Sequence, residues 1–316
     1  MAPGHFHVNT TDAQLKWSRD VPPVAIVEQN QNVTFDLLDS AGGQITRDST
    51  ASDVAKIDIN TCDPIFGPVF IKGAEPGDVL ECEFVKLETA DWGFTAVTPG
   101  FGLLADEFPD PALKIFSWTQ ADSHIQFCDG IRIPKRPFLG ISGVSPGDVG
   151  EFSTIPPLET GGNMDCRYLT EGTKLFLPVK VAGALFSCGD GHAAQGDGEV
   201  CGTAIETNMK ATIRFTVHKG MSYVTSPQFD TRGSVHPDLQ SRGPVYGTLG
   251  IDPDLHEACK KAVRAMIEYL VATRGLDRVD AYMLTSLVAD LQVTEVVDMP
   301  HYTVTASLPY NIYTED

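Results

Sequence analysis

The chain has 316 residues, of which 42% are hydrophobic, so it is long and apolar enough to bury the core of one large or two modest domains. Acidic residues outnumber basic ones by 42 to 23, and the formal net charge of −19 excludes a surface suited to nucleic acid or to anionic membranes. The sequence has no apolar run of about 20 residues and no signal-peptide pattern, so we expect a cytoplasmic protein.

Residues 20 to 225 read as a series of short strands. Apolar and polar residues alternate in segments that begin near residues 33, 68, 78, 130 and 211, and Gly, Pro, Asp and Asn turns separate these segments. Two xPGD sequences, at 75–78 and 145–148, fit hairpin corners because proline presets φ and glycine takes the left-handed position. This spacing is typical of a β-sandwich or barrel.

The last quarter of the chain is partly helical. Asp252 as N-cap, Pro253 at the first helical position and Gly275 as C-cap predict one helix, with an apolar stripe of Leu255, Ala258, Ala262, Met266 and Leu270. A second helix from 278 to about 290 should bury Tyr282, Leu284, Leu287 and Val288, and two strands should follow it. We therefore expect a β-rich portion over 1–225 and a smaller α+β portion over 226–316, packed together as one continuous globular unit.

Polar and ionisable residues gather between residues 163 and 206. The sequence GDGHAAQGDG at 189–198 places Asp190, His192, Gln195 and Asp197 among glycines, and Glu199 follows directly. The run 174–188 reads as two strands punctuated by Pro178 and Gly183, and 199–206 opens another. We interpret the segment between them as a glycine-rich loop that joins buried strands, because rigid flanking strands can hold loop groups in position. The alternative is a hairpin whose acids are only solvated.

Several blocks of the sequence carry a family resemblance. They are GGNMD at 161–165, LPVKVAGALFSCGDGHAAQGDGEVCGTAIE at 177–206, DLLDSAGGQIT at 36–46 and GAEPGDVLECEF at 73–84. Together with WSRDVPPV, GISGVSPGD and YGTLGIDPDLHEA they span nearly the whole chain, which resembles the acetamidase/formamidase family and, within it, a formamidase most. One departure is Asp63, which stands before Pro64 where related chains tend to have glycine.

The resemblance implies a fold and an activity. The fold is a β-rich α+β structure, a CUB-like β-sandwich with a smaller C-terminal α+β portion. The activity is hydrolysis of a small neutral amide, formamide first and acetamide second, to a carboxylate and ammonia, while some relatives act on cyclic amides (lactams). A non-catalytic CUB-like module that holds calcium on its acidic loop is the competing class.

Three designs supply the chemistry of amide hydrolysis. In the first, Asp165, His192 and Asp190 hold a divalent metal ion, with zinc favoured, and Glu199 is the general base and acid. In the second, Cys188 or Cys201 attacks the amide, although neither lies in an obviously cationic setting. In the third, Asp197 and Glu199 activate a water without metal.

Further residues have more general roles. Asn163 is expected to donate to the developing oxyanion, and Gln195 to orient the substrate or stabilise the loop. The remaining expected substrate contacts are Gly189, Gly191, Asp36 and Gln44, and possible extra metal ligands are His5 and His7.

Strand alternation over 199–206 would put Glu199 and Glu206 on opposite faces, so these two carboxylates should not act together. Apolar edge strands favour a homo-oligomer.

Overall fold

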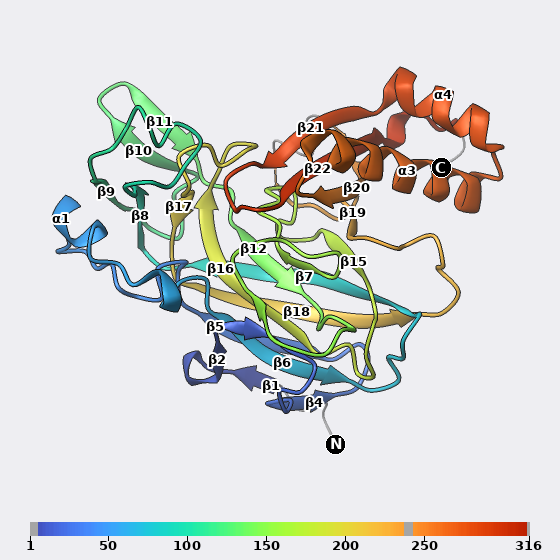
Figure 1. Ribbon diagram of the computed structural model, residues 1–316, viewed down its shortest axis with the longest axis horizontal. Helices are drawn as coiled ribbons and strands as arrows, with labels where there is room; N and C mark the ends of the chain where they lie inside the picture. The colour runs from blue at the N-terminus through green and yellow to red at the C-terminus, as the bar shows by residue number, and fades with distance from the viewer. Residues whose placement is uncertain (1–5, 237–242, 315–316) are drawn as a thin grey trace.

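The structure is a computed structural model that describes residues 6–236 and 243–314, and it is built mainly of β-sheet (Figure 1). One sheet, called the first sheet below, has nine strands. In spatial order they are β1 (Phe6–Val8), β5 (Asn32–Leu37), β18 (Met209–His218), β7 (Val79–Thr89), β15 (Lys174–Pro178), β19 (Gln228–Asp230), β20 (Val245–Asp252), β22 (Tyr302–Pro309) and β21 (Asp290–Glu295).

The second sheet also has nine strands, and its central strands carry the functional residues. Its main path is β14 (Gly161–Asn163), β12 (Phe138–Gly143), β16 (Phe186–Ala194), β17 (Ile205–Glu206), β8 (Trp92–Val97) and β9 (Ala112–Ser117). Strand β6 (Ile65–Ile71) pairs with β16, and β2 (Ala13–Gln14) and β4 (Ala25–Val27) pair with β6. Two further pairs are β10 (His124–Cys128) with β11 (Ile131–Pro134), and β3 (Lys16–Trp17) with β13 (Phe152–Ser153).

The main hydrophobic core lies between the two sheets. Strand β16 crosses β7 and β18 in Figure 1, and side chains of all three strands enter the same buried cluster. At its centre the ring of Phe186 lies 6.0 Å from that of Phe35 and 4.9 Å from that of Phe215. The alternation of apolar residues along these strands therefore packs one face of each sheet against the other.

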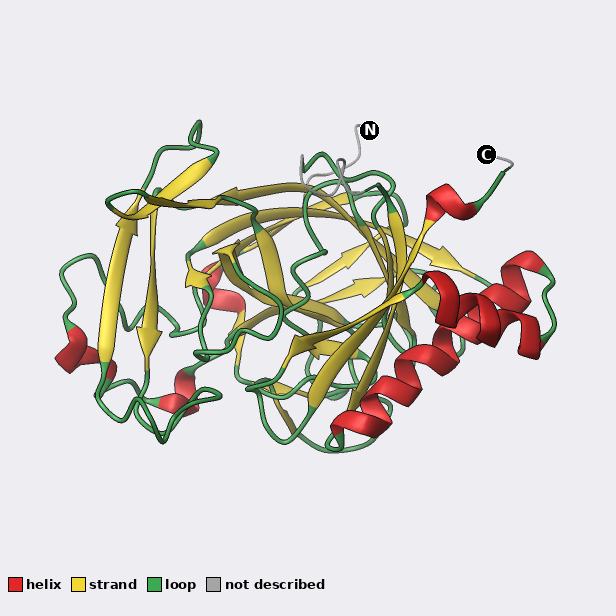
Figure 2. Cartoon of the chain, turned by 90° about the horizontal axis from the view of Figure 1, so that it is seen from above, coloured by secondary structure: helices red, strands yellow, loops and turns green. Residues whose placement is uncertain are grey.

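Two helices cover the outer face of the first sheet near the C-terminus, as Figure 2 shows. They are α3 (Leu255–Arg274), which packs on β20 and β22, and α4 (Arg278–Val288). The shorter helices are α1 (Ala51–Val54) and the 3-10 turns η1 (Thr10–Asp12), η2 (Ile59–Thr61) and η3 (Tyr310–Ile312). None of the helices in the described part of the chain is long and apolar enough to span a bilayer.

The helix predictions are confirmed in outline and wrong in two details. Gly275 ends α3 in the left-handed conformation, with φ of 67°, as predicted. The N-cap is Asp254 rather than Asp252, because the Asp254 side chain accepts the Glu257 backbone N–H at 3.0 Å. On α4, Tyr282 and Leu287 are 59% and 79% exposed, since Ala281 and Thr285 take the buried positions of that helix instead.

The predicted glycine-rich loop at 189–198 is wrong for its first half, and the predicted strand 199–206 shrinks to Ile205–Glu206. Residues 186–194 form β16, which is buried throughout between β12, β6 and β17. Close packing explains its glycines, because a Cβ on Gly189 would lie 2.3 Å from the Pro64 carbonyl oxygen and one on Gly191 would lie 2.6 Å from Met209 Cβ. Glycine here serves sheet packing rather than a loop.

The β-rich character predicted from the sequence is confirmed. Strands β19 and β20 extend the first sheet beyond residue 225, so the C-terminal portion shares a sheet with the preceding residues. The division at 225 and the likeness to the CUB class both stay predictions.

Candidate active site

His192 lies at the centre of a buried cluster of acids. It is carried by β16, and its ring packs edge-on against Phe138, the residue opposite it on β12, at a centroid distance of 4.8 Å. The side chain is only 1% exposed. This packing holds the imidazole in one orientation, with both nitrogens directed at acidic neighbours.

Two carboxylates lie next to His192 Nε2. Asp190 Oδ1, two residues earlier on β16, is 2.9 Å away, and Glu206 Oε2 is 3.2 Å away. Glu206 is the residue directly opposite His192 in the pairing of β17 with β16. Facing residues of an antiparallel pair bring their side chains together, so the short strand β17 is what delivers Glu206 to the site.

Asp165 and Glu199 approach the imidazole from elsewhere. Asp165 Oδ1 lies 3.8 Å from His192 Nδ1 and comes from the turn after β14. Glu199 comes from a turn that is fixed to β21, because the Gly198 backbone N–H donates to the Thr294 carbonyl at 2.9 Å. Asp165, His192 and Glu199 have ligand atoms within 4.8 Å of one another, and so do Asp190, His192 and Glu206.

The backbone at these acids is in an uncommon conformation. Asp165, Asp190 and Glu199 have φ of 45°, 56° and 46°, and Asp63 nearby has φ of 52°. Non-glycine residues rarely adopt positive φ, and such strain gathers at functional sites. The left-handed conformation turns these side chains inward, where regular strand geometry would alternate them between faces.

Gly140 of β12 forms the floor of the cluster. A Cβ at this position would stand 2.1 Å from Asp190 Oδ2, 2.5 Å from Asp165 Oδ1 and 2.9 Å from His192 Cε1. The space that any other side chain would occupy is therefore filled by the acids themselves.

The cluster has the composition of a metal site. Both oxygens of Asp165, Oδ1 of Asp190, Oε2 of Glu206 and both nitrogens of His192 are buried without a hydrogen bond. Buried polar atoms are normally paired, and leaving charged ones unpaired is costly. Ligand atoms about 3 Å apart that do not bond to one another suit a shared divalent cation with bonds of about 2.0–2.2 Å. The residues fit such an ion.

Electrostatics supports the same interpretation. Burial raises the pKa of Asp165 and holds the pKa of Asp190 and Glu199 well above the usual range. Burial lowers the pKa of His192, but Asp190 and Glu206 outweigh it and raise that pKa well above its usual value. Burial raises the pKa of Glu206, but His192 outweighs burial, and the pKa of Glu206 falls below its usual value. Without a cation the site must therefore hold extra protons.

These acids open into a cavity of about 320 Å³, called the acidic cavity here. Its polar lining includes Asp63, Asn163, Asp190, Glu199, Glu206 and Asp298. Its apolar lining includes Ile57, Ile59, Phe94, Phe101 and Ile155. The cavity has room for about ten waters at roughly 30 Å³ each, so it can hold an amide of a few non-hydrogen atoms.

Asn163 lines the acidic cavity in an arrangement unlike the expected one. Its Nδ2 donates to Asp298 Oδ2 at 2.8 Å, while its Oδ1 is buried without a partner. The unsatisfied atom is thus an acceptor, which suits a ligand N–H better than an oxyanion.

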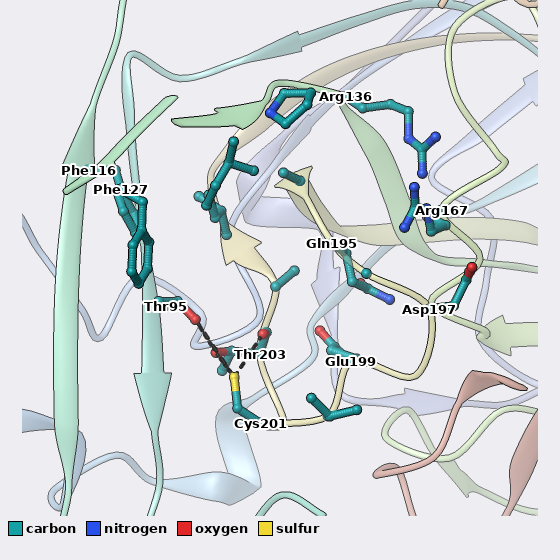
Figure 3. A pocket seen from close by; sticks show the side chains of 17 residues that line it. Thr95, Phe116, Phe127, Arg136, Arg167, Gln195, Asp197, Glu199, Cys201 and Thr203 are labelled. Atoms are coloured by element: carbon teal, nitrogen blue, oxygen red, sulfur yellow. Dashed lines mark hydrogen bonds between the residues drawn. The ribbon is translucent and has the colours of Figure 1, made fainter. Parts of the chain in front are cut away.

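Gln195 and Asp197 line a second cavity of about 440 Å³, shown in Figure 3. We call it the arginine cavity; its polar lining includes Arg136, Arg167, Gln195, Asp197 and Glu199. Gln195 Nε2 donates to the Asp165 carbonyl oxygen at 2.9 Å, so Gln195 stabilises the turn of Asp165, the second of its two expected roles. Asp197 accepts a hydrogen bond from the Tyr168 hydroxyl at 3.2 Å.

The remaining expected substrate contacts lie outside the acidic cavity. Asp36 on β5 pairs with His7 Nε2 at 2.7 Å, on the first sheet. Gln44 ties the loop of residues 41–61 together, donating to the Ala41 carbonyl and Thr61 Oγ1. Gly189 and Gly191 face packed neighbours, as described above. His5 lies outside the described residues.

The two cysteines near the site differ in setting. Cys188 is buried in the main core, and burial raises its pKa well above the usual range, which opposes a thiolate. Cys201 is exposed at the arginine cavity and donates to the Thr203 carbonyl at 3.4 Å.

Four residues of the acidic cavity or its floor escaped the sequence interpretation. The predicted separation of Glu199 from Glu206 is wrong, because residues 199–204 form a turn and both carboxylates line one cavity. Asp298 and Gly140 lie far from the motif in sequence and carried no local signal. Asp63 did carry one, since an acid stands there where glycine is usual among related chains.

Comparison with known proteins identifies the family. A model of the acetamidase/formamidase family matches residues 5–149 and 150–315. The chain belongs to this family.

Individual relatives agree with the assignment. The formamidase of Methylophilus methylotrophus is 25% identical over 96% of this chain and 91% of its own length. The acetamidase structure from Bacillus halodurans is 27% identical with a TM-score of 0.87, covering 97% of this chain and 98% of that one. The gamma lactamase structure from Delftia acidovorans is 26% identical with a TM-score of 0.67, covering 98% and 90%. This member of the family is thus an amidohydrolase that acts on linear amides.

Proposed function

We propose that the protein hydrolyses short linear amides, with formamide as the preferred substrate, in the acidic cavity. The observation that carries the proposal is the set of buried ligand atoms of Asp190, His192 and Glu206, which lie within 4.8 Å of one another. Two of these residues, Asp190 and Glu206, line a cavity able to hold a small amide. The Methylophilus relative is named a formamidase, which supports formamide as the first substrate to test. The net charge of −19 favours a neutral substrate over an anion.

A divalent ion, with zinc as the first candidate, would be held by Asp190, His192 and Glu206, with Asp165 on the other side of the imidazole. When bound, such an ion lowers the pKa of a water molecule and polarises a carbonyl group. His192 would have to be neutral and the carboxylates ionised, so binding would release the extra protons of the empty site. Calcium fits less well, because it prefers six to eight oxygen ligands and a histidine is central here.

Glu199 is the residue we assign as general base and acid. It lines the acidic cavity without belonging to the Asp190, His192 and Glu206 set. In its ionised form it would take a proton from the attacking water, and it would return that proton to the amide nitrogen as the C–N bond breaks. Burial raises its pKa, and a raised carboxylate pKa suits both roles near neutral pH.

Asn163 is assigned to hold the amide. Its unpaired Oδ1 would accept a hydrogen bond from the substrate NH2 group, while its Nδ2 stays on Asp298. This contact selects a primary amide over an ester, which has no N–H to donate. The apolar side chains of Ile57, Phe94 and Ile155 would lie against the acyl chain of acetamide.

The first test is ammonia release from formamide and acetamide by the purified protein, before and after chelation, with zinc and other divalent ions returned one at a time. Loss of activity with the chelator and recovery with one ion supports the metal proposal. Full activity after exhaustive chelation contradicts it and favours water activation by Asp197 and Glu199 alone. Cys201→Ser is the matched control for a thiol mechanism, and it should retain activity.

A second candidate activity is hydrolysis of a cyclic amide. The Delftia gamma lactamase has the same fold at a TM-score of 0.67, and the acidic cavity of about 320 Å³ is larger than formamide needs. Turnover of 2-pyrrolidinone faster than of any linear amide would favour this activity.

We also propose that the protein forms a homo-oligomer. Strand β21 is at the edge of the first sheet, and α4 exposes Val279, Tyr282, Met283 and Leu287 beside it. Exposed apolar patches of this kind are common at subunit interfaces. The mass in solution, measured by light scattering, tests this proposal.

A further inference from the structure

The arginine cavity is lined by two cationic side chains, Arg136 and Arg167, that form no ion pair within the described residues. Arg136 is 5% exposed, and its Nη2 is buried without a hydrogen bond. Arg167 is partly buried, and its Nε is also buried without a hydrogen bond. Figure 3 shows the two guanidinium groups directed toward each other. An anion bound between two like charges with unsatisfied donors would stabilise both of them.

The acids nearby do not supply that anion. Within residues 6–236 and 243–314, no ion pair joins Arg136 or Arg167 to an acidic side chain. Asp197 accepts from the Tyr168 hydroxyl instead. Glu199 lines the cavity as well, without forming an ion pair or hydrogen bond with either arginine. Both arginines therefore line the cavity without an acidic partner among the described residues.

Arg136 is held firmly in this position. Its backbone N–H donates to the Ala193 carbonyl oxygen at 2.8 Å, and Ala193 follows His192 on β16. Its guanidinium carbon lies 6.0 Å from the centre of the Tyr168 ring. The charge is thus built into the same strand that carries the metal-site histidine, rather than placed on a mobile surface side chain.

One wall of the cavity is apolar. Phe116 and Phe127 lie across the cavity from the arginines in Figure 3. Ile133, Ala194 and Ile205 also line the cavity. A planar guanidinium pair on one side and hydrocarbon on the other suits a carboxylate with a short hydrocarbon body. Glu199 and Thr203 line this cavity and the acidic cavity alike, so the two cavities adjoin.

We propose that the arginine cavity is a carboxylate-binding subsite, in which Arg136 and Arg167 bind the anionic group. This proposal rests on the proposed amidase function for its source of carboxylate. The carboxylate comes either from the product as it leaves the acidic cavity or from a substrate that carries a carboxylate remote from its amide. In both cases the two arginines would bind a carboxylate group, and kinetic measurements distinguish a product carboxylate from a substrate carboxylate.

The test is calorimetric titration of butanoate into the full-length protein at pH 7, which needs no turnover. We expect Arg136→Gln and Arg167→Gln each to weaken binding at least tenfold, and Arg136→Lys to weaken it less, because lysine keeps the charge but not the planar fork. Arg132→Gln is the matched control, since Arg132 is an exposed cation on β11 and should leave binding unchanged. Pentan-2-one, a neutral probe, should bind all variants equally.

Two kinetic arms identify the source. A product subsite predicts that Arg136→Gln raises the inhibition constant of butanoate against formamide turnover. A substrate subsite predicts that Arg136→Gln weakens the apparent affinity for glutaramate, which has an amide and a carboxylate at opposite ends. The apparent affinity for pentanamide, which lacks the carboxylate, should not change in that variant.

Butanoate binding to both glutamine variants within twofold of wild type would overturn the proposal, and so would a lack of binding to the wild-type protein. Binding that depends on the arginines in a protein that releases no ammonia from any amide would overturn the proposed function and leave the subsite standing.

Discussion

Gly140 lies directly beneath Asp190, so close that a Cβ added to the glycine would be 2.1 Å from Asp190 Oδ2. We predict that Gly140→Ala abolishes metal binding and reduces amide turnover by about two orders of magnitude or more, because Asp190 and Asp165 must both move. Metal content after dialysis and ammonia release measure these effects. Gly196→Ala is the control, since a Cβ there meets nothing within 4 Å. Normal metal content in Gly140→Ala would contradict this account of the floor.

Glu206 faces His192 across the β16 and β17 pair. For the proposed zinc site, we predict that Glu206→Gln weakens zinc binding by roughly tenfold to a hundredfold, because an anionic candidate ligand is lost while the size of the side chain is kept. The rise in melting temperature on zinc addition should shrink accordingly.

Glu81→Gln provides the comparison for this variant. Glu81 is also buried and also bonds a histidine, His218, at 2.7 Å, but it lies on the first sheet. If the rise in melting temperature on zinc addition shrinks equally in both variants, the measurement reports general destabilisation and not the loss of a ligand.

Asp63 combines a carboxylate in the acidic cavity with a left-handed backbone, φ 52°. We predict that Asp63→Gly changes the free energy of unfolding by no more than about 1 kcal/mol, since glycine adopts this φ freely. It should also raise the kcat/KM of propanamide relative to formamide several-fold, because the cavity widens. Asp63→Asn keeps the side-chain volume and should leave that ratio near wild type. A ratio raised equally by both variants would show that charge, not space, controls selectivity.

Glu295 makes the stability of the metal-free protein depend on pH. Burial raises its pKa from 4.5 to about 8, although the backbone N–H groups of Asp298 and Val297 oppose the shift. A raised carboxyl pKa stabilises the fold below the unfolded pKa, and this stability is lost as pH rises toward about 8. We predict that the free energy of unfolding falls as the pH rises from 4.5 to about 8. The proton on Glu295 contributes up to about 1.4 kcal/mol per pH unit to this fall.

Denaturant unfolding of the chelated protein from pH 4.5 to pH 8.5 measures this slope. Asp63, whose pKa burial raises to about 8, contributes in the same direction. Glu295→Gln should flatten the profile, because its uncharged amide can still accept from the backbone N–H groups of Val297 and Asp298. An unchanged slope in that variant would assign the pH dependence to other groups.

Much of the fold could be predicted from local pattern. Strands such as β5, β7 and β18 alternate apolar and polar residues, and α3 has a glycine C-cap, so periodicity and turn chemistry located them. The pattern failed at β16, where Gly189 and Gly191 suggested a loop. Their real cause is close packing against Pro64 and Met209, which only the tertiary structure shows.

The candidate site likewise contains some residues that the sequence could predict and others that it could not. Asp165, Asp190, His192 and Glu199 were predictable, because polar residues in an apolar setting stand out in sequence. Strand alternation predicted Glu206 on the face opposite Glu199, but the chain between the two residues turns instead. Positive φ at such positions results from tertiary constraint and has no reliable signature in non-glycine residues.

The acidic cavity draws its lining from positions as far apart as Asp63 and Asp298. No contiguous half of the chain contains this set, and a fragment that ends at residue 149 includes Gly140 but not His192. Formation of the acidic cavity therefore depends on contacts between residues far apart in sequence. Separation of the segments that carry these residues would disrupt the cavity. Heat inactivation should consequently coincide with the earliest cooperative loss of structure and precede the melting of α3, a helix closed by local hydrogen bonds.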